Sequence, residues 1–407
     1  MGPAGKQSMR PGTGYWLWLF GAIWAELGST VTLFAITWTA TGFGGGAAGL
    51  VATSTMLLRL VLLLGGGSTA DRFGPRRVMI TCDFCMLAVT LGMAAWFALQ
   101  GPTVGSLLVF GCVLGIVSAF YMPASGVFPR LFVDDGQLGR VMATTSTGLQ
   151  LARIAGPALG GILLAWIGLS WVVALNAATF LLVASIILFV VPPRPHRPPD
   201  STPVGFRESW RDLKAAGHHR ILVPLLVALG ALVAGVTPAI ALLIPLLSRD
   251  RGWSAASAGL MEGAFMAAAL VVGALVATRG TLRRDSIPMI WGPVLAAAGL
   301  IGMAWAPAVW MACAAAATTS LGMVSFNCHA LPRFLAASPP GAQARLQAVL
   351  AVTTTVPMLA LSGPYGLLAQ HASPGWALGV AAVFAAAAGV VVAITHPWTA
   401  PTVAPVG

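Results

Sequence analysis

Long stretches without a formal charge are the feature that most constrains this chain. Residues 84–129, 154–193 and 221–248 contain no Asp, Glu, Lys or Arg. Only 8% of all residues are charged and 57% are hydrophobic, whereas soluble globular proteins have about 25% charged residues. Because about 20 apolar residues cross the hydrocarbon of a bilayer as a helix, these runs predict membrane-spanning helices.

The apolar segments and the residues that interrupt them predict twelve spans. Closed β-barrels also satisfy the backbone in lipid, but these segments are too long for barrel strands. The first segment is too long for a cleaved signal peptide, so we expect it to be retained. Trp16 and Trp18, near its start, are expected to lie in an interfacial aromatic belt. The predicted spans are 15–39, 47–70, 78–99, 104–126, 140–166, 170–191, 221–247, 255–278, 287–305, 308–330, 345–369 and 374–395.

The positions of Lys and Arg predict the orientation in the cell membrane, because cytoplasmic loops carry an excess of these residues. With the N-terminus in the cytoplasm, the outer loops hold only Arg249 and Arg251, while Arg59 and Arg153 lie inside spans. All the others among the 22 Lys and Arg residues then fall on the cytoplasmic side. We therefore expect both termini in the cytoplasm. The net charge of +11 follows from this topology and requires no nucleic-acid partner.

A polar stretch at 192–220 divides the chain into two halves. It begins with a Pro-rich run that favours an extended path. Apolar residues then recur at the spacing of a short amphipathic helix on the inner leaflet, with a solvated linker helix as the alternative. We expect one six-helix bundle over 1–191 and a second over 221–407.

Short motifs recur at corresponding places in the two halves. They are Pro-Arg at 129–130 and 332–333, Arg-Arg at 76–77 and 283–284, and Gly-Pro at 156–157 and 363–364. Their nearly equal separations indicate two halves of like topology. Transporters built in this way place the substrate at the interface of the repeats, near the bilayer midplane.

The charged loop between the second and third predicted spans is distinctive. Residues 67–77 read Gly-Ser-Thr-Ala-Asp-Arg-Phe-Gly-Pro-Arg-Arg. This loop resembles the signature that transporters of the major facilitator superfamily carry between their second and third helices. The resemblance implies an all-α membrane protein with twelve transmembrane helices in two pseudo-symmetric six-helix bundles, the major facilitator fold.

The same resemblance implies roles for individual residues of this loop. In the family, the signature stabilises one conformation through charge contacts, and Asp71, Arg72 and Arg76 inherit that gating role by matching position. Gly67 and Gly74 would allow close packing and the tight turn.

A second motif points to a branch of that family. Residues 156–161 read Gly-Pro-Ala-Leu-Gly-Gly and resemble the antiporter motif of the superfamily's drug exporters. Residues 119–124 and 176–181, in the neighbouring spans, fit the branch that includes enterobactin and macrolide exporters. The resemblance implies proton-driven export and a bending or sealing role for the motif, with close helix packing as the alternative. The residues concerned are Gly156, Pro157, Gly160 and Gly161.

Charged residues inside predicted spans are costly and usually functional. Glu26, Arg59 and Arg153 lie within about 3 Å of one depth near the midplane, at 1.5 Å per residue. We expect Glu26 to cluster with Arg59, Arg153 or both. Such a carboxylate could exchange a proton for a substrate, and a fixed ion pair that only joins helices is the alternative.

Two further carboxyls lie inside spans. Glu262 has no obvious partner on its own helix and is the candidate for proton or cation binding in the second half, with an outer vestibule as the alternative location. Asp83 lies near the cytoplasmic end of the third span, where Arg76 or Arg77 could reach it. We interpret it as part of the gating charge network of the loop.

The sequence contains no nucleotide-binding loop, metal-ligand cluster or catalytic triad. We therefore expect no enzyme activity, no cofactor and no metal, and energy supplied by an ion gradient. The predicted function is proton-coupled export of an amphipathic small molecule by a monomer. The alternatives are an uncoupled facilitator or importer, and a receptor on the same fold that does not transport.

Overall fold

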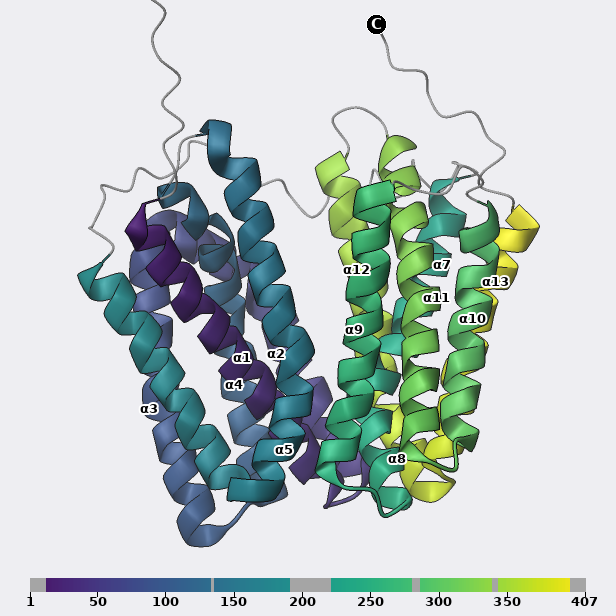
Figure 1. The fold of residues 1–407 in the computed structure, drawn as a ribbon, viewed down its shortest axis with the longest axis horizontal. Helices are drawn as coiled ribbons and strands as arrows, with labels where there is room; N and C mark the ends of the chain where they lie inside the picture. The colour runs from purple at the N-terminus through teal and green to yellow at the C-terminus, as the bar shows by residue number, and fades with distance from the viewer. Residues whose placement is uncertain (1–11, 133–134, 191–220, 280–285, 339–342, 396–407) are drawn as a thin grey trace, which may run out of the picture. The chain divides into compact units, whose positions relative to one another are not determined.

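The computed structural model describes residues 12–132, 135–190, 221–279, 286–338 and 343–395. None of these residues lies in a β-strand, so the all-helical architecture expected from the sequence is confirmed. The elements drawn in Figure 1 are α1 (Thr13–Thr41), α2 (Gly45–Phe73), α3 (Pro75–Gln100), α4 (Val104–Val127), η1 (Phe128–Leu131), α5 (Asp135–Phe189), α7 (Leu222–Pro238), η2 (Ala239–Leu243), α8 (Ile244–Asp250), α9 (Ala255–Arg279), α10 (Ser286–Trp305), α11 (Val309–Ala336), α12 (Gln343–His371) and α13 (Pro374–Thr395).

The helices coincide with the predicted spans, with two departures in how the spans are joined. The fifth and sixth spans form one element, α5, which is broken at Gly168, where φ is 74° and ψ is 171°. Glycine tolerates this positive φ because it has no Cβ. The seventh span is formed by α7, the π-helical turn η2 and α8 together.

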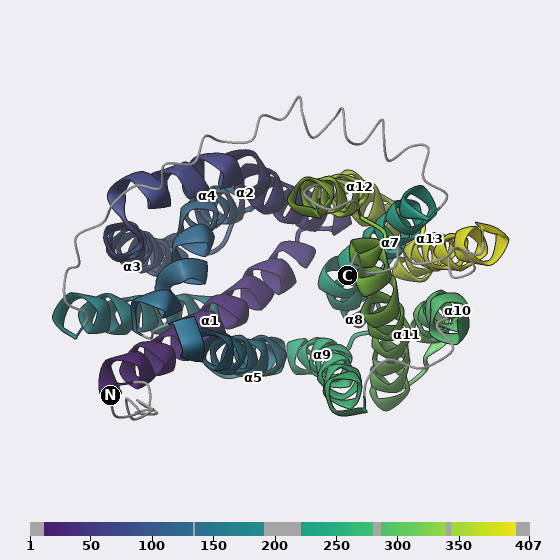
Figure 2. The ribbon, with the colours of Figure 1, turned by 90° about the horizontal axis from the view of Figure 1, so that it is seen from above.

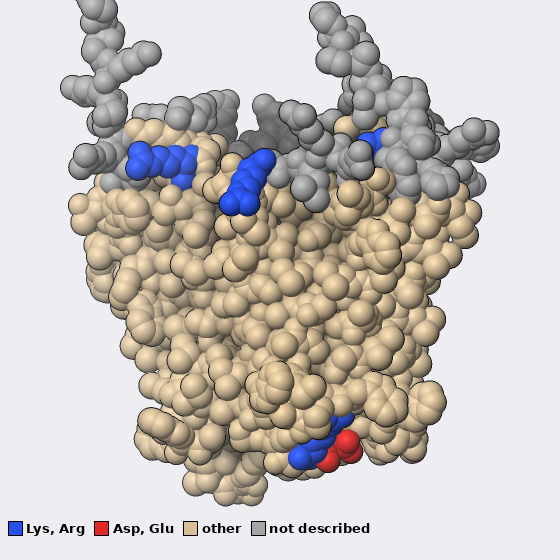
Figure 3. Space-filling model, turned by 45° about the vertical axis from the view of Figure 1, so that its right-hand side comes forward, with Lys and Arg blue, Asp and Glu red and all other residues tan. Residues whose placement is uncertain are grey.

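Ten segments of the described chain are long and apolar enough to cross a membrane. One of them, Gln137–Phe189, has 53 residues and contains the spans on both sides of Gly168. The helix α12 is not among the ten. Twelve crossings therefore stay a prediction, with which these helices are consistent. Figure 3 shows a face on which Lys, Arg, Asp and Glu lie only toward its two ends, with a broad uncharged band between them.

The chain forms two compact units whose boundaries cut through α1, α2 and α5. Unit 1 consists of Met1–Ala35, Ser54–Gly156 and Trp166–Asp200, and unit 2 of Ile36–Thr53, Pro157–Ala165 and Ser201–Gly407. Unit 2 thus includes the parts of α1, α2 and α5 that lie toward the predicted outer side. The predicted linker at 192–220 lies outside the described residues.

An aromatic cluster forms the core of unit 1 at the predicted cytoplasmic end of α1. The ring of Trp18 lies 5.2 Å from that of Phe128 and 5.7 Å from that of Phe132, and only 2% of Trp18 is exposed. The expectation that Trp18 belongs to an interfacial belt is therefore wrong, because its indole packs inside the protein. Trp16, two residues earlier, is 51% exposed.

In unit 2, α11 packs against α9 and α10, and α13 packs against α7 and α10 (Figure 2). Small residues permit the contact between α10 and α11. A Cβ on Gly322 would overlap the carbonyl oxygen of Gly292, and a Cβ on Gly299 would overlap the hydroxyl of Thr319. Such close contacts at small residues are typical of membrane helices, where close backbone approach replaces hydrophobic burial as the source of packing energy.

Candidate functional site

The first half of α5 runs parallel to α1 along a series of close contacts within unit 1. The Tyr15 hydroxyl donates a hydrogen bond to the carbonyl of Val141 (3.1 Å) and lies 3.1 Å from the Thr145 hydroxyl. Two turns further along, a Cβ on Gly148 would lie 2.6 Å from Cδ1 of Ile23. The two contacts are separated by similar numbers of residues on α1 and on α5, so the two helices stay side by side between them.

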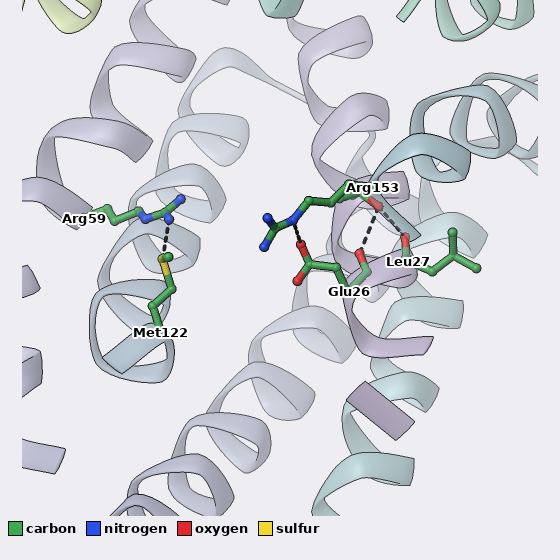
Figure 4. Close-up of polar contacts among 6 residues, drawn as sticks. Glu26, Leu27, Arg59, Met122 and Arg153 are labelled. Carbon is green, nitrogen blue, oxygen red and sulfur yellow. Dashed lines mark hydrogen bonds and ion pairs between the residues drawn. The ribbon is translucent and has the colours of Figure 1, made fainter. Parts of the chain in front are cut away.

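The next contact along the same two helices is an ion pair. Arg153 Nε donates to Glu26 Oε1 at 2.5 Å (Figure 4). The Glu26 side chain is 26% exposed and that of Arg153 is 47% exposed, so the pair is not sealed inside the helix packing. Of the two partners predicted for Glu26, the structure places Arg153 in contact.

One turn beyond the ion pair, Thr30 of α1 packs against Gly156 of α5. The Thr30 hydroxyl donates to the carbonyl of Glu26 at 2.9 Å and to that of Leu27 at 3.0 Å. A Cβ on Gly156 would overlap this hydroxyl. Because glycine leaves room for Thr30, α1 and α5 approach closely enough for the short Glu26 and Arg153 side-chain contact.

Arg59 on α2 does not hydrogen-bond to Glu26 within the described part of the chain. Its Nη2 instead donates to Sδ of Met122 on α4 (Figure 4). The guanidinium nevertheless lies within electrostatic range of both Arg153 and Glu26. The site therefore combines one carboxylate and two guanidinium groups, of which only Arg153 is engaged with the carboxylate.

Glu262 lies in unit 2, on α9, and is partly buried. No hydrogen bond or ion pair joins its carboxyl to another described residue. One turn before it, a Cβ on Gly259 would overlap the carbonyl oxygen of Pro157, and a Cβ on Gly161 would overlap that of Ala255. Glu262 is therefore one turn away from the place where α5 and α9 are in backbone contact.

This α5–α9 contact shows where the Gly-Pro motif lies. Gly156 faces α1, whereas Pro157 and Gly161 face α9, and Gly160 is also buried. The motif thus makes close contacts in the predicted outer half of the fifth span. This geometry agrees with close packing of small residues.

Close to the Gly-Pro of the second half, small residues of α12 and α2 are in contact within unit 2. A Cβ on Gly366 would overlap the carbonyl oxygen of Gly45, and a Cβ on Gly45 would overlap that of Gly366. The Gly46 amide donates to Gln370 Oε1 at 2.8 Å. A Cβ on Gly49 would lie 3.0 Å from the carbonyl oxygen of Ser362.

A third contact at the predicted outer side involves Arg249 of α8, which in the sequence indicates only the membrane topology. Its Nε donates to Thr41 Oγ1 at 2.7 Å, and its Nη2 donates to the carbonyl of Trp38 at 2.9 Å. The guanidinium carbon also lies 4.5 Å from the centre of the Trp38 ring. Arg249 thus joins the end of α1 to α8 within unit 2, and no motif in the sequence indicates this contact.

The loop signature lies at the junction of α2 and α3. Gly74, between the two helices, is buried and has a φ of 84°, which favours glycine. The guanidinium carbon of Arg72 lies 5.3 Å from the centre of the Phe73 ring. Gly67 and Asp71 lie in α2, and their surroundings are outside the part of the structure that is described.

The predicted contact of Asp83 with Arg76 or Arg77 is not formed. Arg76 Nη2 donates to the carbonyl of Leu188 at the end of α5, at 3.0 Å, and Arg77 is exposed. Asp83 is 1% exposed, and neither of its carboxyl oxygens has a hydrogen-bond partner among the described residues. The reason is its place on α3, where it faces the helix packing and not the loop.

No group of three or more His, Cys, Asp or Glu residues able to hold a metal occurs in the described part of the chain. The described elements therefore offer a membrane-embedded carboxylate and guanidinium site and a set of tight helix contacts. Such an arrangement can bind and release protons or polar groups, and it can hold helices in one conformation.

Two named relatives share sequence with this chain. The multidrug efflux pump Tap of Mycobacterium tuberculosis is 32% identical over 160 residues, covering 37% of this chain and 38% of Tap. The enterobactin exporter EntS of Salmonella typhimurium is 27% identical over 241 residues, covering 59% of this chain and 56% of EntS. The chain thus spans less than two thirds of the length of either relative.

Solved transporter structures share the fold over nearly the full chain. An inward-facing bacterial homologue of the iron transporter ferroportin has a TM-score of 0.72 and 15% identity, covering 94% of this chain and 98% of that one. An inward-facing bacterial homologue of the human lysosomal transporter Spinster has a TM-score of 0.69 and 16% identity, covering 94% and 95%. A sequence model of the Major Facilitator Superfamily matches residues 18–356. The chain therefore belongs to the Major Facilitator Superfamily of membrane transporters.

Proposed function

We propose that this transporter exports an amphipathic small molecule in exchange for protons, and that Glu26 is the group that binds the proton. The observation that carries the proposal is the ion pair between Glu26 and Arg153, inside the span and partly exposed. A charged pair at this depth is costly in a membrane and is usually retained for function. The efflux pump and the exporter among the relatives support the outward direction.

The chemistry follows from competition for one carboxylate. In its ionised form, Glu26 accepts a charge-assisted hydrogen bond from Arg153, and such bonds are roughly twice as strong as neutral ones. A proton or a donor group of the substrate competes for the same oxygens, so the site holds one of them at a time. One charge that moves across 100 mV supplies about 2.3 kcal/mol, which serves to drive export.

Arg59 and Arg153 shape this competition through their charge. Protonation of Glu26 leaves two guanidinium groups within electrostatic range of each other and without a nearby anion. Their repulsion disfavours the protonated state in the present arrangement and favours a movement of α2 or α5. We infer that this repulsion couples proton binding to conformational change.

The remaining predicted residues are assigned to the gate and to a second binding group. Glu262, without a partner among the described residues, is proposed to bind a proton or a cation in the second half. The loop residues Gly67, Asp71, Arg72, Gly74, Arg76 and Arg77 and the motif Gly156, Pro157, Gly160 and Gly161 are proposed to stabilise alternate conformations. The tight α5–α9 contact at Gly259 and Gly161 supports the second assignment.

The topology is part of the same proposal. We infer that both termini are cytoplasmic, that the chain is a monomer, and that six-helix bundles over 1–191 and 221–407 are joined by a linker. The distribution of Lys and Arg supports the orientation. Labelling of single cysteines with a membrane-impermeant reagent in whole cells tests it, because only residues of outer loops should react.

Transport in proteoliposomes tests the function. Ethidium, an amphipathic cation, is the first probe, and a resistance panel in a pump-deficient host supplies others. We expect an imposed pH gradient to drive accumulation by the unmodified protein. Glu26→Gln should abolish this response but retain exchange of labelled for unlabelled probe, because exchange needs no net proton movement. Glu26→Asp should restore part of the response.

Other outcomes identify the alternatives. Flux of the identified probe that is the same with and without a pH gradient would show an uncoupled facilitator, in which the ion pair only joins α1 to α5. Saturable binding without flux would show a receptor on the transporter fold. A Glu26→Gln variant that still responds fully to the gradient would refute the role of this carboxylate.

A further inference from the structure

Asp83 occupies an unusual place on α3. One face of this helix is buried over several turns, and the exposed fractions of Met79, Asp83, Met86 and Thr90 along it are 0%, 1%, 3% and 0%. A carboxyl group therefore stands within a stripe of otherwise apolar or internally bonded side chains. The polar group is as completely buried as the methionines on either side of it.

Several hydrogen-bond donors near this stripe bond to backbone carbonyls, and the buried indole N–H of Trp18 bonds to no described residue, Asp83 included. The Thr90 hydroxyl donates to the carbonyl of Met86 at 2.6 Å, within its own helix. Arg76 donates to the carbonyl of Leu188, and the Tyr15 hydroxyl, in the neighbouring core, donates to that of Val141. Both Asp83 oxygens are left without a hydrogen-bond partner in the described chain.

Such surroundings distinguish between the two forms of the carboxyl. An ionised carboxylate without donors or a counter-ion is very costly in an apolar medium, and such a group neutralises instead. The neutral acid lacks a full charge and loses much less by burial. The packing of α3 therefore selects the protonated form of Asp83.

No charged or titratable group of the described chain forms an ion pair that would stabilise the ionised form of Asp83. The other charged and titratable described side chains on the helices of unit 1 are Cys82, Cys85, Arg76 and Arg77 on α3; Cys112 and Tyr121 on α4; Tyr15 and Glu26 on α1; Arg140 and Arg153 on α5; and Arg59 and Arg72 on α2. The ring of Tyr121 lies within electrostatic range of both Asp83 and Glu26. Arg153 is paired with Glu26, and Arg59 donates to Met122. No salt bridge links a cation of the described chain to Asp83.

A cavity lies beside this part of α3. A cavity of about 460 Å³ is lined by residues of α2, α3 and α4. The exposed side chains of Phe73 and Arg77 lie on its wall, as do Cys82 and Cys85, which flank Asp83 in sequence. A rotation of α3 by a fraction of a turn would therefore bring the buried carboxyl toward the cavity, because Cys82 precedes it by about 100° around the helix.

We propose that Asp83 is a second proton-binding site of this transporter, protonated in the present conformation and able to release its proton when α3 turns toward the cavity. The site differs from Glu26, whose carboxyl is paired with Arg153. The part that Asp83 takes in coupling rests on the proposed function, whereas its protonation does not.

Infrared spectroscopy of the purified protein in lipid nanodiscs tests the protonation directly. A protonated carboxyl has a C=O stretching band that ionised carboxylates lack. At neutral pH we expect the unmodified protein to show this band, Asp83→Asn to lose the contribution of one carboxyl per protein, and Glu26→Gln to leave it unchanged. Asp83→Glu, which keeps the acid if Asp83→Asn does not fold, should shift the band and not remove it.

The outcomes separate this inference from the proposed function. A spectrum that is the same for Asp83→Asn and the unmodified protein overturns the inference, since Asp83 is then ionised. A band that is lost as expected, in a protein whose transport ignores the pH gradient, supports the protonation and refutes the proton-coupled function. If Asp83→Asn leaves the band unchanged while the Glu26 variants alter pH-driven transport as expected, the inference about Asp83 is wrong and the proposed function stands.

Discussion

Replacing Arg249 with alanine should loosen the end of α1 that carries Trp38 and Thr41. Arg249 lies on α8 and donates to the Trp38 carbonyl through Nε at 3.3 Å and Nη2 at 2.9 Å. It also donates to Thr41 Oγ1 at 2.7 Å, and its guanidinium lies over the Trp38 ring. These contacts join two helix ends that are separated by about half of the chain.

The magnitude follows from these contacts. Hydrogen bonds to charged groups contribute about 1.5–3 kcal/mol each, and a cation–π contact at an exposed site adds about 0.5–1 kcal/mol. Because Arg249 is exposed, water replaces part of what is lost, and the terms are not additive. We therefore expect a loss of about 2 kcal/mol, which is roughly a 30-fold change in the equilibrium for opening this contact.

Hydrogen exchange measured by mass spectrometry is the assay, because local opening governs exchange of protected amides. In Arg249→Ala, the peptide that covers residues 36–44 should exchange roughly 30-fold faster, the factor derived above. Arg251→Ala is the matched control, since Arg251 contacts the Ala304 carbonyl and the Trp253 ring. That control should leave the peptide unchanged and affect only residues near Ala304.

Two results would refute this reasoning. Exchange over 36–44 that stays within about twofold of the unmodified protein in Arg249→Ala would show that the contact contributes little to closure. An equal acceleration in both arginine variants would show that loss of a positive charge, and not the specific contact, is responsible. Neither result would bear on the ion pair in unit 1.

Three further predictions concern packing, the ion pair and a helix cap. Gly156→Ala should lower stability by about 1–2 kcal/mol in a thermal melt, because the added Cβ would overlap Thr30. Gly363→Ala is the control and should be neutral or stabilising, since no atom lies within 4 Å of the added Cβ. Equal melting temperatures of the two variants would contradict this prediction. A double-mutant cycle with Glu26→Gln and Arg153→Gln should give a coupling energy of about 1 kcal/mol, since the pair is partly exposed, and strict additivity would show no net interaction. Thr103→Ala removes the capping box at the start of α4 and should cost about 1 kcal/mol, measured by the same melt; an unchanged melting temperature would show that water replaces the cap.

The positions of the helices could be predicted from the sequence because a local property determines them. A span must have enough consecutive apolar residues to cross the hydrocarbon, and breakers such as Gly168 mark where one span ends. The alignment of Glu26 with Arg153 in depth could be predicted for the same reason, since the rise per residue is constant. The choice between Arg153 and Arg59 could not, because it depends on which helices are neighbours.

The failures have the same cause. Trp18 was expected in an interfacial belt, yet it packs against Phe128 and Phe132, which come from a distant part of the chain. Asp83 was expected to meet an arginine of the loop, yet its face of α3 turns into the core. For both residues the sequence gives the kind of side chain, but the direction in which it points depends on the packing around the helix.

The amino-acid order alone predicts a helical membrane protein, the positions of its helices and the charges inside its spans. These properties depend on neighbouring residues, because membrane helices satisfy their backbone internally. The three-dimensional packing is needed to show that α1 meets α5 through Gly148 and Gly156, that Arg153 pairs with Glu26, and that Arg249 holds the end of α1. Those contacts join residues far apart in the chain, and steric fit between helices selects them.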